Sequence, residues 1–496
     1  MNLDDLEGMP EAQLWELLNT TVASEKAEVA YILARKLLDK KEFNEALAVA
    51  ETLVTLATEE QMDAFRAEGH FISGNCHSAL DGELEAVAEF KLAADFFQKE
   101  GLEVLTAVSL SRAANSLNQL EQWTEALELA ESALNIALAN DELQIAGESE
   151  LSRAAAHQAL GNPDEALSAY ARSRDYFRKI SMVDRVLVVD NETGLLLQEL
   201  EQHEAAVERF RGCLTMSRER NNDTETAHFA QMLGRSLVFS GMMESGVEYL
   251  QEARALAAQH NLWWVAGGAE LDLAYAYYRN DDIAESYEYA SRAHFQFDFN
   301  GDDSRAITAM VRMAVCLWAM QDYKKAARAN QNVIELAKSD ESLVSYLDAA
   351  VDRLAECHFA LGENDTALEV LQQHVPTNPE DQKIFSKIFR LYLRARILWM
   401  RGDKAEAAEL AQQALDLTVE EQVTFRTPHL YEILSEHYKE IDKERSDKNL
   451  LHAIALFLAF DNHDKATELS RQLLPQIPTY EQSLEQQAAA PQPVVG

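Results

Sequence analysis

The amino-acid sequence predicts an all-α protein, a solenoid in which helix pairs follow one another along the chain. Three observations support this fold class. Ala, Leu and Glu dominate the 496 residues while Pro (9) and Gly (18) are scarce, a composition that favours helix almost throughout. A spacing of 40 residues recurs over most of the chain, and each period holds two small residues that stand twelve positions apart. No run of alternating β-branched residues indicates a strand.

One period, residues 144–180, illustrates how each repeat is expected to fold. Two amphipathic segments flank a break at Gly161, Asn162 and Pro163. Gly161 suits a helix end, Asn162 is a candidate N-cap, and Pro163 fits the first helical position. Glu165, three residues after the cap, would complete a capping box. The same cap column also holds Asp282, Asp322 and Asp403, and the capping-box column also holds Glu285 and Glu406.

Small residues mark the close approach of the two helices in every repeat. In the first helix they are Ala34, Gly74, Ala114, Ala154, Gly194, Gly234, Ala274 and Ala314, followed after a one-residue insertion by Ala355 and Ala395. In the second helix they are Ala46, Ala86, Ala126, Ala166, Ala206, Gly246, Ser286, Ala326, Ala367 and Ala407. Because interiors are close-packed, an unbroken column of Ala, Gly and Ser predicts buried positions where two antiparallel helices touch.

The repeats are expected to occupy residues 25–420, with a capping segment before them at residues 1–24. The ends of a repeat array need a cover, because their apolar faces would otherwise meet water. Leu14, Trp15, Leu17 and Leu18 lie in an amphipathic stretch that could cover the first repeat. These side chains are therefore predicted to pack against it.

The C-terminal end is predicted to be irregular. Residues 421–475 would form capping helices, with one helix at 423–440, a charged break at 442–449, and a last helix pair at 450–460 and 464–474. Ala455 and Thr467 keep the twelve-residue spacing within this last pair. Residues 476–496 carry too few apolar side chains to pack and are predicted to be disordered.

Charge and hydropathy exclude several function classes. A formal charge of -40 argues against a nucleic-acid partner or an anionic membrane, since both need a basic footprint. No apolar run approaches the ~20 residues that span a bilayer, and no secretory leader begins the chain. The sequence therefore predicts a soluble, cytoplasmic protein without membrane contacts.

Cysteines and acidic loops offer no convincing metal site. Cys76, Cys316 and Cys357 occupy one column, two residues after the first small residue, which indicates a buried core position rather than a disulfide or metal ligand. An acidic loop around Gly301 imitates a calcium loop, but its first and last ligand positions are Gln296 and Ile307. No phosphate loop, nucleophile elbow or HExxH motif is present. We expect no cofactor, no metal and no catalytic residue.

In its register and its pairs of small residues, the repeat resembles the tetratricopeptide repeat family over residues 27–415. It departs from the common form in its period of 40 rather than 34 residues, and it lacks the proline that usually closes each repeat. This longer form resembles the arrays of bacterial peptide-sensing regulators and of the sensor regions of some transcription activators. The resemblance implies a right-handed superhelical solenoid of about ten helix-turn-helix repeats with capping helices at its ends.

The resemblance also implies which residues line a concave, ligand-binding face on the first helices. In the early repeats these are Asn75, Arg112, Asn115, Asn118, Gln158, Asn191, Gln198 and Gln231. In the later repeats they are Arg235, Tyr275, Tyr278, Arg279, Arg312, Trp318, Arg353, Phe359, Tyr392, Arg396 and Trp399. Amides can pair with the backbone of an extended peptide, while Arg and aromatic side chains supply carboxylate contacts and rigid anchors.

A structural alternative exists for this face. Asp272, Asp352 and Glu356 map to it and could pair with its arginines, which would leave an internal ladder without a ligand. The ligand interpretation predicts a scaffold or adaptor for protein–protein interaction, whose partner is a protein or an extended peptide. One alternative is a regulatory switch that is gated by a peptide and acts on a separate protein. Another is an enzyme with a cleft in the C-terminal helices, and the oligomeric state stays open.

Overall fold

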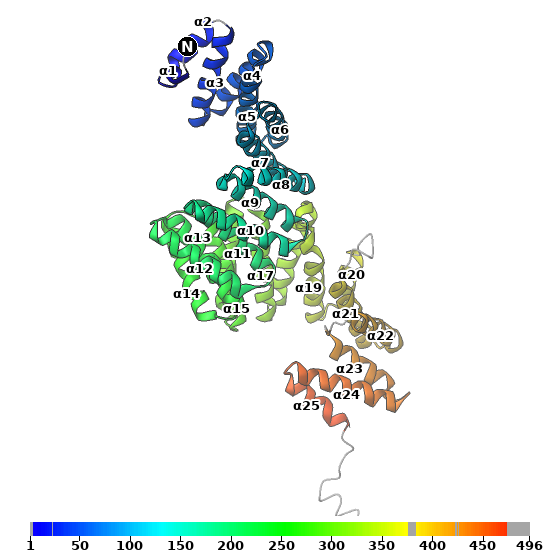
Figure 1. Cartoon of the computed structure of the whole chain (residues 1–496). Coiled ribbons are helices and arrows are strands. Elements are labelled where there is room, and N and C mark those ends of the chain that lie inside the picture. The colour runs from blue at the N-terminus through cyan, green and yellow to red at the C-terminus, as the bar shows by residue number, and fades with distance from the viewer. Residues whose placement is uncertain (1–2, 22, 375–382, 422–423, 425, 474–496) are drawn as a thin grey trace, which may run out of the picture. The chain divides into compact units, whose positions relative to one another are not determined.

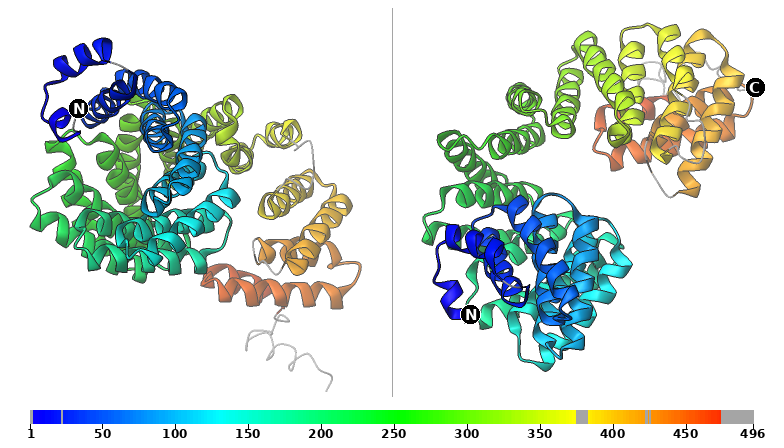
Figure 2. Two further views of the ribbon diagram at one scale, coloured as in Figure 1. Left: turned by 45° about the horizontal axis from the view of Figure 1, so that its top comes forward. Right: turned by 90° about the horizontal axis from the view of Figure 1, so that it is seen from above.

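In the computed structural model of the chain, residues 3–21, 23–374, 383–421, 424 and 426–473 are described. They form helices and turns and contain no strand. The chain divides into two compact units, Met1–Val265 and Ala266–Gly496, and the boundary falls within helix α15. Within each unit, successive helices pack against one another as antiparallel pairs (Figure 1, Figure 2). The all-α repeat fold predicted from the sequence is confirmed.

The helices have the following bounds. Up to the boundary they are α1 (Leu3–Glu7), α2 (Glu11–Thr20), α3 (Ala23–Asp39), α4 (Phe43–Glu59), α5 (Asp63–Ala79), α6 (Glu83–Lys99), α7 (Glu103–Gln119), α8 (Trp123–Ala139), α9 (Leu143–Ala159), α10 (Pro163–Lys179), α11 (Val183–Glu199), α12 (His203–Glu219), α13 (Asp223–Phe239) and α14 (Met243–Gln259). From the boundary on they are α15 (Trp263–Arg279), α16 (Ile283–Phe299), α17 (Asp303–Ala319), α18 (Tyr323–Ser339), η1 (Glu341–Tyr346), α19 (Leu347–Ala360), α20 (Asn364–Gln373), α21 (Ile384–Arg401), α22 (Lys404–Glu420), α23 (Thr427–Tyr438), α24 (Lys443–Ala459) and α25 (His463–Leu473).

The 40-residue period comes from uniform helices and turns. From α3 to α18 every helix has 17 residues, and from α3 to α17 each is followed by a short turn whose middle residue has a positive φ. In the turn after α9 that residue is Gly161, whose N–H bonds the Gln158 carbonyl while the Asn162 N–H bonds the His157 carbonyl. This pair of bonds is a Schellman motif, which satisfies the last carbonyls of the helix.

The predicted side-chain caps are mostly wrong. Asn162, Asp282 and Asp403 stand at the N-cap but make no side-chain cap bond, so the capping box with Glu165 does not form. Only Asp322 of that column accepts a backbone N–H, from Lys325. In these turns the Schellman bonds already fix the backbone of the N-cap residue, so its side chain is not needed to hold the turn.

All twenty small residues predicted at helix contacts are buried. The close approach of the two helices at these positions is clearest at the glycines. A Cβ built on Gly194 would lie 2.6 Å from the Phe210 ring, and one on Gly234 would lie 2.9 Å from the backbone oxygen of Gly246. The twelve-residue spacing therefore marks the contact within each helix pair, as the sequence predicted.

The N-terminal helices cover the first helix pair. Leu14 and Leu18 are buried in one cluster with the apolar side chains of α3 and α4, and Trp15 and Leu17 pack against it partly buried. The Lys36 ammonium donates to the carbonyls of Glu7 and Met9, both at 2.7 Å.

Deleting residues 1–24 is expected to lower the melting temperature and to promote self-association, because it uncovers the apolar face of α3. Deleting residues 476–496, which lie outside the described residues, should leave the melting temperature unchanged. Differential scanning calorimetry and light scattering on the two truncated proteins test this pair of outcomes. Identical behaviour of both would refute the assignment of the ends.

The predicted arrangement of the C-terminal helices is wrong in one respect. The charged segment 442–449 is no break but the start of α24, because the Asp442 carboxylate caps the helix by accepting the Arg445 N–H at 3.1 Å. Ala455 and Thr467 are both exposed and mark no helix contact. An eleventh pair is instead formed by α23 and α24.

Two serines form the close contact of this eleventh pair. The hydroxyl of Ser435 donates to the Ser446 carbonyl at 2.9 Å, and the hydroxyl of Ser446 donates to the Ser435 carbonyl at 2.8 Å. Both serines are buried. Each hydroxyl thus finds an acceptor across the helix contact, which lets two polar side chains take the place of two alanines.

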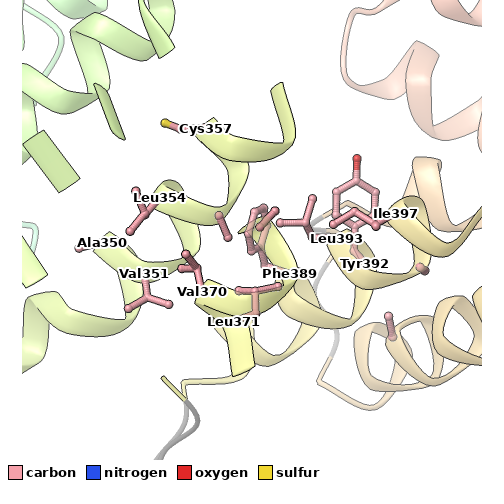
Figure 3. Packing of buried hydrophobic residues seen from close by; sticks show 14 of the residues in the cluster. Ala350, Val351, Leu354, Cys357, Val370, Leu371, Phe389, Tyr392, Leu393 and Ile397 are labelled. Carbon is pink, nitrogen blue, oxygen red and sulfur yellow. The ribbon is translucent and has the colours of Figure 1, made fainter. Parts of the chain in front are cut away.

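The C-terminal unit has a continuous apolar core. Figure 3 shows Val351 and Leu354 of α19, Leu371 of α20, and Phe389 and Leu393 of α21 packed together. Such packing across three helices explains how this unit continues past the one-residue insertion and the 3₁₀ turn η1 without losing its repeat.

The three cysteines predicted to be core residues are buried, and Cys213 is buried as well. Cys76, Cys213, Cys316 and Cys357 are all fully buried with free thiols. Burial raises the pKa of Cys76 to about 11 and that of Cys357 to about 12, so both stay protonated at neutral pH. The neighbouring His77 and His358 are partly buried, and the acidic loop at Gly301 is an ordinary turn between α16 and α17.

Candidate functional site

The first helices of the C-terminal unit carry arginines and aromatic residues on one face. We name it the arginine–tyrosine face, and its residues are Tyr275, Tyr278, Arg279, Arg312, Arg353, Phe359, Tyr392 and Arg396. Its centre is Arg312 of α17, whose guanidinium carbon lies 5.1 Å from the ring centroid of Tyr275 and 5.5 Å from that of Tyr278. Two tyrosine rings from α15 therefore hold this cation by cation–π contacts.

Arg312 has no counter-ion within the part of the chain that the structure describes. Its side chain is partly buried, and burial, together with the nearby positive charge of Arg353, holds its pKa below the usual value. Arg353 of α19, also partly buried, likewise makes no ion pair with a described residue. Two neighbouring cations without carboxylate partners form a site that an anion would stabilise.

Two of the three carboxylates that map to this face pair with other arginines. Asp352 accepts from Nε of Arg390 at 2.7 Å, and Glu356 accepts from Arg426 at 2.7 Å. Burial raises the pKa of Asp352 to about 6 even though Arg390 opposes the shift. For Asp352 and Glu356, the internal ladder to Arg312 and Arg353 is therefore absent.

The face continues onto α21. Arg396 lies 5.1 Å from the Phe359 ring centroid, and its Nη1 donates to the Tyr392 hydroxyl at 2.9 Å. Arg279 repeats this arrangement by donating to the Tyr275 hydroxyl at 3.0 Å. Each arginine is positioned by the tyrosine four residues before it on its own helix, one turn away.

Three aromatic residues of the predicted site serve the core more than the surface. Tyr392 is only 3% exposed. Trp318 is partly buried against the core of the C-terminal unit, and Trp399 is partly buried beneath the Lys404 ammonium, 5.0 Å from a ring centroid. Tyr392 therefore offers little surface to a ligand.

In the N-terminal unit, the predicted amides mostly bond their own fold. Asn118 donates to the Ser152 carbonyl at 2.8 Å, Gln158 to Glu199 at 2.9 Å, and Gln198 to the Ser236 hydroxyl at 2.7 Å. These three residues stand 40 positions apart and link successive first helices. They form a ladder of amide hydrogen bonds between first helices, which differs from the ladder of arginines and carboxylates that the sequence left as an alternative.

The remaining predicted residues of this unit differ in exposure. Asn75 donates to the Phe71 carbonyl of its own helix, Asn191 contacts Glu192 and His228, and Gln231 is buried. Only Arg112, Asn115 and Arg235 are exposed. No continuous face of free amides exists among the described residues of the N-terminal unit.

Sequence reasoning missed Arg426. This residue precedes α23 with a positive φ, pairs with Glu356 across 70 positions, and lies 5.4 Å from the Tyr392 ring centroid. No local pattern identifies such a long-range partner. Arg426 neutralises Glu356 through this ion pair.

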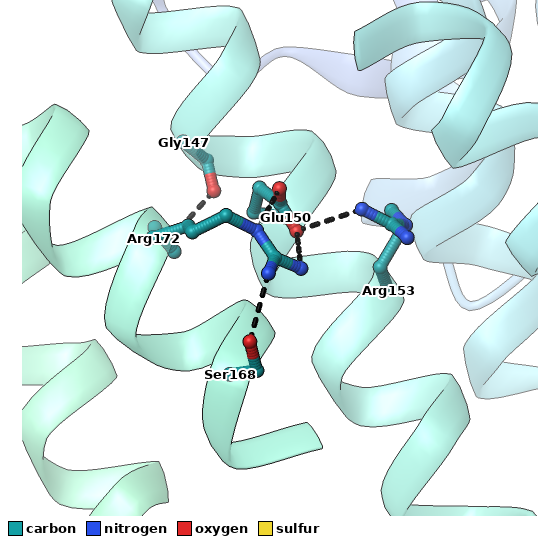
Figure 4. A network of polar contacts seen from close by, with 6 residues as sticks. Gly147, Glu150, Arg153, Ser168 and Arg172 are labelled. Carbon is teal, nitrogen blue, oxygen red and sulfur yellow. Dashed lines mark hydrogen bonds and ion pairs between the residues drawn. The ribbon is translucent and has the colours of Figure 1, made fainter. Parts of the chain in front are cut away.

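Two buried carboxylates of the N-terminal unit were also missed. Glu150 is 1% exposed and accepts from Arg153 at 3.0 Å and from Arg172 at 2.6 Å, as Figure 4 shows. Asp190, 40 positions later and 2% exposed, lies 2.6 Å from Arg174. The shared column is the sequence signal, because an acid where Ala30, Leu110, Ala230 and Met310 stand in other repeats predicts a buried ion pair.

Comparison with known proteins finds similar structures but no sequence relative. No family model and no curated protein matches the sequence. The apo form of RapI matches 55% of this chain and 97% of its own, at 14% identity and a TM-score of 0.44. The apo form of the quorum sensor NprR from B. thuringiensis matches 67% and 96%, at 13% identity and a TM-score of 0.45. Aspartyl phosphate phosphatase F from Bacillus subtilis matches 71% and 93%, at 14% identity and a TM-score of 0.45.

The fold class follows from the repeat itself. Pairs of antiparallel helices recur every 40 residues, and small residues twelve positions apart are buried where the two helices of a pair meet. No helix of the described residues is long and apolar enough to cross a membrane. The chain is an all-α protein built from repeated pairs of antiparallel helices.

Proposed function

We propose that this protein is a protein-interaction scaffold that holds an extended acidic segment of another protein against the arginine–tyrosine face. The observation that carries the proposal is Arg312, a partly buried cation held between two tyrosine rings without a carboxylate partner among the described residues. Taking a charge out of water costs free energy, and an incoming carboxylate would recover it.

The chemistry of the face suits a carboxylate better than a neutral ligand. A guanidinium donates two parallel N–H bonds to one carboxylate, which fixes its orientation. Arg312 keeps all its N–H donors free of protein acceptors within the described residues, and so does Arg353. Tyr275 and Tyr278 add rigid aromatic surface, a residue class enriched at binding hot spots.

The net charge of the chain does not oppose this assignment. At physiological ionic strength the Debye length is ~8 Å, so acidic side chains on distant helices are screened from a peptide at this face. Local charge decides the binding. Asp352 and Glu356 are the acids nearest to Arg353 in sequence, and both are paired with other arginines.

Selection of random peptides displayed on phage tests the proposal. The wild-type protein is expected to enrich sequences in which Asp or Glu stands beside an aromatic residue. The double variant Arg312→Gln/Arg353→Gln should not enrich them, since glutamine keeps much of the side-chain volume and removes the charge. The same consensus from both proteins, or no consensus from the wild type, would overturn the assignment.

A further inference from the structure

A second concave site lies in the N-terminal unit, between the second helices α10 and α12 and over α11. It is an open groove of about 500 Å³, within the size range of small-molecule sites. Leu167 of α10, Leu197 of α11 and Met216 of α12 form its apolar wall. The arginine–tyrosine face plays no part in it.

The groove exists because short residues stand where other repeats carry longer side chains. Ala205 precedes the small residue of α12, at a column where other repeats carry Glu45, Glu85, Glu125, Glu165, Glu285 and Glu406. Gly212 stands at a column where other repeats carry Thr52, Leu92, Ser132, Arg172, Glu252, Arg292, Asn332 and Gln413. A Cβ built on Gly212 meets no atom within 4 Å, so open space lies above it.

A third reduced side chain completes the opening. Ala171 of α10 lines the groove at a column that elsewhere holds Glu51, Lys91, Glu131, Arg211 and Gln251. Long polar side chains cover the apolar surface between second helices, because their methylene stems lie along it. With Ala171, Ala205 and Gly212 together in one groove, that cover is absent.

Two arginines of the groove approach the same carboxylate, Asp190, while Glu208, which also lines the groove, pairs with Arg211. Asp190 is 2% exposed and lies 2.6 Å from Arg174 and 3.4 Å from Arg209. Two guanidinium groups thus share one carboxylate. Arg209 makes no other polar contact with the described residues, and its side chain is 37% exposed, so it has N–H donors to offer.

We propose that this groove binds a small organic monocarboxylate with an apolar body. The apolar body would lie against Leu167, Leu197 and Met216, and the carboxylate would accept from Arg209. Glu208 also lines the groove and disfavours a second negative charge on the ligand. A phosphate or a dicarboxylate is therefore a poorer fit than a monoanion. Acetate is also a poorer fit, because it has too little apolar surface to cover the apolar wall.

Isothermal titration with 2-naphthylacetate tests the site on the full-length protein. Saturable binding with one site per chain is expected, and 2-naphthylmethanol, which has the same ring but no charge, should bind more weakly. Arg209→Gln should weaken 2-naphthylacetate by about tenfold or more and leave the alcohol unchanged, since a charged hydrogen bond is lost.

Filling the groove gives a second readout that does not depend on the arginine. Gly212→Gln restores the residue type of Gln413 at this column and should abolish binding of 2-naphthylacetate. Its control is Ser132→Gln, the same column on α8, which should bind like the wild type. Equal binding by Gly212→Gln and the wild type, or no binding by the wild type, would overturn the proposal.

The proposed groove ligand and the proposed function of the arginine–tyrosine face can be refuted independently of each other. Arg312→Gln should leave binding of 2-naphthylacetate unchanged, and Gly212→Gln should leave the peptides selected by the arginine–tyrosine face unchanged. Circular dichroism of each variant shows whether the helices are intact, so a loss of binding can be assigned to the groove.

Discussion

Ala126→Arg is expected to unfold the helix pairs around it, with a loss of more than about 4 kcal/mol in the free energy of unfolding. Ala126 is fully buried and packs in one cluster with Val87, Leu117 and Ala156, which come from three other helices. An arginine there would overpack the contact and bury an unpaired charge. Because each repeat is held by its neighbours, the damage should spread to adjacent pairs.

Circular dichroism during thermal unfolding measures this effect. The variant should show less helix at 20 °C and an earlier, broader transition than the wild type. Ser132→Arg is the matched control, since it places the same side chain at an exposed position of the same helix α8. A wild-type melting curve for Ala126→Arg would mean that the assigned register of the repeats is wrong.

The fold could be predicted from the sequence because its strongest constraint is local and repeated. A small residue is required wherever two helices touch, and the requirement recurs every 40 residues, so twenty positions carry the same information. The last helix pair was misassigned because Ser435 and Ser446 satisfy this contact with hydroxyl bonds at a spacing of eleven. A search for Ala, Gly and Ser at a spacing of twelve cannot find them, because their spacing is eleven.

The site was less predictable than the fold because it depends on pairing between distant segments. The sequence places Arg312, Arg353 and Glu356 on one face but does not show which charges pair. Arg426 reaches Glu356 across 70 positions, and Arg390 reaches Asp352 across 38. These two contacts engage Asp352 and Glu356, and neither Arg312 nor Arg353 makes an ion pair among the described residues.

The amides of the N-terminal unit, unlike Arg312 and Arg353, are engaged within the fold. Asn118, Gln158 and Gln198 have side chains that suit a peptide backbone, yet each bonds the next repeat. An amide offers both donors and acceptors, so the sequence cannot distinguish a binding group from a link between helices. Only the position of the neighbouring helix decides between the two roles.

Arg312→Ala is expected to weaken the binding of an acidic peptide selected on the wild-type protein by roughly 10- to 150-fold. The estimate is about 1.5–3 kcal/mol, the cost of removing a hydrogen bond to a charged group. Arg353→Ala should have an effect of the same order. Arg312→Lys should recover only part of the affinity, since a lysine keeps the charge but loses the planar pair of donors.

Fluorescence anisotropy with the labelled peptide measures these affinities over a range of salt concentrations. Each alanine variant should also show a smaller decrease of affinity with salt, because one ion pair fewer is screened. Arg328→Ala, which removes an exposed arginine from the second helix α18, is the control and should bind like the wild type.

Stability separates a binding arginine from a structural one. Arg390→Ala should lower the free energy of unfolding by about 3–5 kcal/mol, because it leaves the buried Asp352 without its partner. Arg312→Ala breaks no ion pair among the described residues, so its melting temperature should stay much closer to that of the wild type. If Arg312→Ala instead melts as early as Arg390→Ala and binds the peptide normally, Arg312 supports the fold, and the ligand must be sought on another surface.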